Sequence, residues 1–187
     1  MLGLAVVMVT ACTEEPSRLE GGDRTTTARA LAWLAADHLG DPGSARAETD
    51  AAEEFGRAGV GTELAYDGQQ LVLAVGEQMP PASYDCDRPV TRALDGCERL
   101  DEGVLMWEAV APEEDPGVVY LVMPKGRGAV LMFSSGPTIT GDPRELDLAI
   151  DVSDMVALAT DVRVDVTTTD EAVDGGRNLD YWEGPDL

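Results

Sequence analysis

The chain has 187 residues, 44% of them hydrophobic, which suits one compact domain and is too short for two. Its 36 acidic and 13 basic residues give a net charge of -23, and a surface of this sign repels phosphate backbones and anionic head groups. Composition therefore argues against nucleic-acid binding.

The first residues form a short apolar stretch that ends at Cys12. Residues 2–11 carry no charge but are far fewer than the about 20 apolar residues that a membrane-spanning helix needs. Their length suits the apolar region of an export signal, with small residues at its end. The sequence Val9-Thr10-Ala11-Cys12 resembles the lipobox of bacterial lipoproteins. This resemblance implies cleavage before Cys12 and attachment of a lipid to its sulfur, with fatty acyl chains such as palmitate.

The start of the chain departs from that pattern, because lipoprotein signals open with Lys or Arg and residues 1–4 contain neither. The simplest explanation is that translation begins upstream of Met1. The alternative is a buried N-terminal strand or helix with an incidental cysteine. The polar residues 13–27 predict a flexible tether, which favours the anchor. We therefore expect a signal remnant (1–11), a lipidated cysteine with its tether (12–27) and an extracytoplasmic domain (28–187).

Two helices are predicted near the start of this domain. Residues 25–39 place alanines and leucines on one helical face, with a Thr before the helix and Gly40 after it. We interpret His38, near the end of this helix, as a capping or surface residue and not as a catalytic one. Residues 45–57 predict a second, weaker helix with Phe55 on its apolar side.

Five apolar runs predict strands. Residues 62–66 and 70–75 flank the turn-forming pair Asp67-Gly68, which indicates a β-hairpin. The other three runs are residues 104–110, 118–123 and 129–135. Turn-forming connections between them indicate a meander. The sequence therefore predicts a single α+β domain in which an antiparallel sheet of about five strands is covered by the N-terminal helix.

The C-terminal tail is predicted to be largely helical. Leu146, Leu148 and Ile150 alternate with polar residues, and a helix follows over residues 153–160 with Ser153 or Asp151 as its N-cap. Thr169 is expected to cap a last short helical turn.

Cys86 and Cys97 are eleven positions apart in a turn-rich segment. Outside the cytoplasm two such thiols are expected to pair, and a ring of this size contributes about 3 kcal/mol in the chain-entropy model. Two free thiols in a reducing compartment are the alternative. A metal site lacks further ligands, because His38 is the chain's single histidine.

Residues 154–163, with the sequence DMVALATDVR, resemble the C-terminal segment of small actinobacterial lipoproteins that have no established activity. Val162 stands where that segment usually has proline. The resemblance covers a short part of the chain. It implies an extracytoplasmic lipoprotein and supplies no catalytic residue.

The sequence patterns for Ca²⁺ binding, for serine hydrolysis and for a cationic contact site are weak. Acidic groups at Glu113–Asp115 and in the tail (Asp161, Asp165, Asp170, Glu171 and Asp174) are candidates for Ca²⁺, but neither group has the EF-hand spacing. Ser134-Ser135-Gly136 lacks the Gly-x-Ser-x-Gly pattern of serine hydrolases. Lys125 and Arg127 are expected at a cationic hairpin tip, which could contact an acidic partner or lipid head groups.

We therefore expect a non-enzymatic lipoprotein that needs no cofactor or metal. It would be held on the outer face of the cell membrane by its N-terminal lipid and would act as a binding or accessory module for another envelope protein. A lipoprotein that binds a small ligand or Ca²⁺ is the alternative. A hydrolase is the less favoured third possibility.

Overall fold

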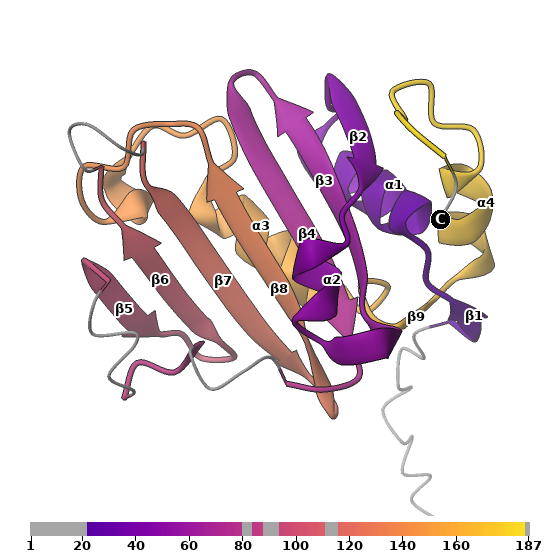
Figure 1. The fold of residues 1–187 in the computed structure, drawn as a ribbon, viewed down its shortest axis with the longest axis horizontal. Coiled ribbons are helices and arrows are strands. Elements are labelled where there is room, and N and C mark those ends of the chain that lie inside the picture. The colour runs from indigo at the N-terminus through magenta and orange to yellow at the C-terminus, as the bar shows by residue number, and fades with distance from the viewer. Residues whose placement is uncertain (1–21, 80–83, 88–93, 111–115, 186–187) are drawn as a thin grey trace, which may run out of the picture.

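The computed structural model describes residues 22–79, 84–87, 94–110 and 116–185 (Figure 1). Its strands are β1 (Arg24–Thr25), β2 (Ser44–Ala47), β3 (Val60–Tyr66), β4 (Gln69–Gly76), β5 (Gly96–Arg99), β6 (Val104–Glu108), β7 (Val118–Lys125), β8 (Gly128–Ser135) and β9 (Thr167–Thr168). Its helices are α1 (Ala28–Leu39), α2 (Asp50–Glu53), α3 (Val152–Thr160) and α4 (Asp170–Gly176), with 3-10 turns η1 (Gly56–Ala58) and η4 (Pro143–Glu145). No helix among the described residues is long and apolar enough to span a membrane.

Seven strands form one antiparallel sheet in the order β2-β3-β4-β8-β7-β6-β5. The α+β class and all five predicted strands are confirmed. The predicted meander of the last three runs is confirmed, because β6, β7 and β8 pair in chain order. The order of the other strands was not predicted, and β4 pairs with β8 and not with the next strand along the chain. The chain crosses to the far edge of the sheet after β4 and returns strand by strand. β5 therefore forms that far edge.

The larger helices begin and end where their sequences predict. The hydroxyl of Thr27 accepts a hydrogen bond from the backbone N–H of Ala30 at 3.1 Å, and α1 ends at Gly40, which has a φ of 85°. Asp151 caps α3, as one of the two predicted N-caps, and Thr169 caps α4. These caps satisfy backbone donors that the first turn of a helix leaves unpaired.

The sheet has a back face covered by helices and a front face that is only partly covered. α1 and α3 lie behind the sheet in Figure 1, and α2 lies in front of it. Alternate strand residues therefore enter two separate cores. The back core includes Leu71, Leu73, Leu121 and Met132, and the smaller front cluster contains Phe55, Val72, Ala74, Met106, Val122 and Leu131.

Two predicted segments differ from the structure. Ala45 lies in strand β2, where a helix was expected, and only residues 50–53 of that segment form α2. Arg24 and Thr25, expected in the tether, pair with Thr168 and Thr167, so the fold begins before Ala28. Both differences arise from pairing with residues distant in sequence, which overrides local preference.

Candidate functional site

A groove hollows the front face of the sheet beside the turn between β3 and β4. Its volume is about 820 Å³, and it is open to solvent. We call it the front groove. It is lined by Gly43, Ala65–Gln70, Pro116, Val118, Tyr120, Phe133, Ser135 and Gly136.

Two aromatic side chains form the floor of the front groove. Tyr120 in β7 and Phe133 in β8 are register partners on neighbouring strands. Their ring centroids lie 6.2 Å apart with the planes tilted by 47°. Both residues are half-buried, so part of each is exposed to solvent. The chain has few aromatic residues, and two of them meet here.

Polar groups lie beside this floor. Gln70 and Ser135 are register partners on β4 and β8, and their side chains make no hydrogen bond to the described part of the chain. Asp67 is exposed in the β3–β4 turn, and Glu108 is exposed opposite Val118 on the front face. Neither carboxylate has an ion-pair partner among the described residues. The groove thus offers hydrogen-bonding groups and uncompensated negative charge.

One wall of the groove depends on two glycines. Gly68 has a φ of 82° and Gly136 a φ of 109°, conformations that residues with a Cβ rarely adopt. A Cβ on Gly136 would also lie 2.4 Å from the carbonyl oxygen of Gly68. The segments that follow β3 and β8 therefore approach each other closely at this end of the sheet.

The remainder of the front face is covered. Phe55 is buried against the sheet, and Tyr84 packs on the same cluster. Burial, with smaller contributions from Glu54 and Tyr120, raises the pKa of Tyr84 to about 12. Tyr84 is therefore uncharged at neutral pH and forms part of this cover.

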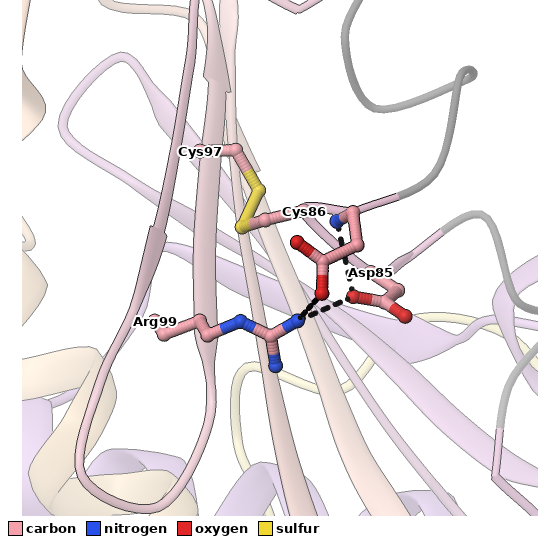
Figure 2. Close-up of a disulfide and its surroundings, with 5 residues drawn as sticks. Asp85, Cys86, Cys97 and Arg99 are labelled. Carbon is pink, nitrogen blue, oxygen red and sulfur yellow. Dashed lines mark hydrogen bonds and ion pairs between the residues drawn. A yellow bond between two sulfur atoms is a disulfide. The ribbon is translucent and has the colours of Figure 1, made fainter.

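Cys86 and Cys97 form a disulfide, as predicted (Figure 2). Cys97 lies in β5, so the bridge fastens residue 86 to the far edge of the sheet. Arg99 adds an ion pair to Asp85 at 3.0 Å and a second one to Asp87. Cys12, the predicted lipid-attachment residue, lies outside the described residues.

The structure separates the residues that a serine hydrolase would need. His38 Nε2 lies 2.8 Å from Asp161 Oδ2, and the backbone carbonyl of Asp161 accepts a hydrogen bond from Lys125. Lys125 stands at the β7–β8 turn, whereas Ser135 ends β8 about 23 Å away at the other end of the strand. Ser134 is buried on the back face and accepts a hydrogen bond from Gln69 at 2.6 Å.

Asp161 is the centre of a polar cluster on the helical side. Arg163 donates to both carboxylate oxygens of Asp161 and also contacts Asp37 at 2.8 Å. Burial alone would raise the pKa of Asp161, but hydrogen bonds from Arg163 and His38 hold it well below its usual value. Lys125 lies at the β7–β8 hairpin tip, as expected, but it is half-buried beside this cluster, and burial lowers its pKa.

Three of the five tail carboxylates proposed for Ca²⁺, including Asp161, are engaged in ion pairs. Asp170 pairs with Arg24, and Asp174 pairs with Arg177 at 2.9 Å. Within the described residues no group of three or more His, Cys, Asp or Glu side chains is placed to hold a metal ion. The other candidate group, Glu113–Asp115, lies outside these residues.

Comparison with known proteins finds no matching family model, no similar curated protein and no similar solved structure. The sequence interpretation did not single out Tyr120 and Phe133. A two-residue turn at Gly126-Arg127 would have placed them opposite each other, because it fixes the register of β7 and β8.

Proposed function

We propose that the protein is a membrane-anchored extracytoplasmic lipoprotein that binds another envelope protein through the front groove and catalyses no reaction. Cys12 would carry the lipid. The lipobox resemblance supports the anchor, and the disulfide supports an oxidising compartment. The observation that carries the binding role is the front groove, with its half-buried aromatic floor.

The shape of the groove favours a segment of a macromolecule over a small ligand. Small-ligand sites are usually concave pockets that enclose most of the ligand's surface, whereas this groove is an open part of a sheet face. The back core directly beneath α1 is filled by side chains such as Leu31 and Leu34, which are fully buried. An apolar surface that the described elements leave uncovered on one sheet face is typical of a protein-binding site.

The hydrolase alternative is weakened by the separation of its parts. The single histidine lies near the β7–β8 turn, and Ser135 lies in the groove at the opposite end of β8. A general base must come within hydrogen-bonding reach of its nucleophile, directly or through one water. A binding role uses Ser135 and Gln70 as hydrogen-bonding groups and needs no such base.

Site-specific photocrosslinking tests this proposal. A photoreactive amino acid is placed at Gln70 in the groove, or at the exposed Asp154 on α3 as the control, in cells that make the full chain. We expect a discrete crosslinked protein from the Gln70 position only. Equal crosslinking from both positions, or none from Gln70, would overturn the proposed role of the groove.

A further inference from the structure

We infer that the front groove recognises an extended peptide segment that presents a Lys or Arg side chain to Tyr120 and Phe133. This inference rests on the proposed binding function and adds the chemistry of the partner. Three independent properties of the groove point to a cationic segment: its charge, its aromatic floor and its dimensions.

Among the described residues, the charge at the groove is negative and has no ion-pair partner. Asp67 is the one charged side chain among the described lining residues, and Glu108 lies beside Val118 just beyond it. Arg46 lies on the same face of the sheet and is already bound to Glu63 at 2.7 Å. With a net charge of -23 on the whole chain, the local field attracts a cation and repels an acidic segment.

The aromatic floor of the groove suits a Lys or Arg head group. A Lys or Arg head group is attracted to an aromatic face when it lies within about 6 Å of the ring centroid. The centroids of Tyr120 and Phe133 are 6.2 Å apart, so one cation that lies over the pair can be within about 6 Å of both centroids. The aliphatic stem of the same side chain would pack on Val118, which is half-buried at the edge of the floor.

The dimensions match a short extended segment. The groove crosses β3, β4, β8 and β7, and four neighbouring strands span about 14 Å, the length of about four extended residues. Gln70 and Ser135 lie along this path. Their amide and hydroxyl groups can donate to and accept from the peptide backbone, whose polar groups must be paired when they leave water.

Peptide titrations followed by amide NMR spectra of the full chain test the inference. The probes are capped pentapeptides Gly-Val-Xaa-Val-Gly in which the central residue is Lys, Arg, Gln or Glu. We expect the Lys and Arg peptides to shift resonances of Val118, Tyr120 and Phe133. The Gln peptide should bind at least about fivefold more weakly, and the Glu peptide should not bind measurably.

Variants separate the contribution of the negative charge from that of the aromatic floor. Asp67→Asn with Glu108→Gln should weaken the Lys peptide about three- to tenfold, and Phe133→Leu should weaken it by a similar factor. The double change Asp154→Asn and Glu171→Gln removes the same charge from exposed positions in the helical layer and should leave binding unchanged. Equal weakening by this control pair would overturn recognition at the groove.

The possible outcomes distinguish failure of the cationic inference from failure of the proposed binding function. If the Gln peptide binds the groove as tightly as the Lys peptide, the cationic inference is wrong while the groove remains a binding surface. If none of the peptides shifts groove resonances, the cationic inference is also wrong. Failure of photocrosslinking at Gln70 would then overturn the proposed binding function separately.

Discussion

The side chain of Gln69 forms hydrogen bonds with both the N–H and the C=O group of the Ile150 backbone. The side-chain Oε1 of Gln69 accepts from the N–H of Ile150 at 3.0 Å, and its Nε2 donates to the carbonyl of Ile150 at 3.1 Å. Gln69 is buried, and so is Ile150, so water cannot replace these bonds. This pair fastens the start of β4 to the segment that leads into α3.

Replacing Gln69 by Leu is therefore expected to lower the free energy of unfolding by about 2–3 kcal/mol, because two buried backbone groups lose their partners. The matched control is Gln70→Leu on the front face, which should change stability by less than about 0.5 kcal/mol. Urea unfolding of both variants measures the difference. Equal effects of the two changes would contradict this role for Gln69.

The disulfide is expected to stabilise the far edge of the sheet. The double variant Cys86→Ser and Cys97→Ser should lose about 3 kcal/mol of unfolding free energy, since the open chain gains conformational freedom in the unfolded state. Adding a reductant should lower the stability of the wild type to that of the double variant and leave the variant unchanged. A wild type that is insensitive to the reductant in urea unfolding would show that the bridge contributes nothing.

Asp161 is expected to contribute to acid sensitivity. Its pKa in the folded state lies below the ordinary value of 3.8, so its contribution is fully present above about pH 4 and is lost as the pH falls further. Asp161→Asn should be less stable than wild type at neutral pH and should lose less stability on acidification below about pH 4. Asp154→Asn is the control and should follow the wild type. Parallel pH profiles for wild type and Asp161→Asn would refute the assignment.

Gly128 is expected to tolerate no side chain. A Cβ there would lie 1.8 Å from the backbone carbonyl oxygen of Gly76, and neither strand can move without breaking the β4–β8 pairing. Gly128→Ala should therefore cost at least about 2 kcal/mol. Gly141 has no atom within 4 Å of the same position, so Gly141→Ala should be neutral or slightly stabilising. Thermal unfolding that ranks the two variants in the opposite order would disprove this packing.

The strands could be predicted because their apolar residues form local patterns. Which strands pair with each other in the sheet could not be predicted in the same way. Strand β2, Ser44–Ala47, has no β-branched residue, and its alanines favour a helix. Its strand conformation comes from pairing with β3 and from the contact of Ala45 with the C-terminal segment at Tyr181 and Glu183. Such pairing depends on residues far apart in the sequence.

The candidate site was less predictable than the fold. Cys86 and Cys97 could be paired from their spacing and from the expectation of an oxidising compartment. The front groove was not predicted, because no local pattern shows that α2 covers only part of one sheet face. Gln69 and Gln70 illustrate the limit: they are adjacent and chemically identical, yet one is buried in the back layer and the other is exposed in the groove.

The central claim is that this domain works at a membrane surface, held there by Cys12. Metabolic labelling with a fatty acid, in cells that express the wild type or Cys12→Ala from the gene's own locus, tests it most directly. The account predicts that the wild type carries the label and fractionates with membranes, and that Cys12→Ala loses both properties. A Cys12→Ala protein that keeps its label and its membrane location, or a wild type that is never labelled, would contradict it.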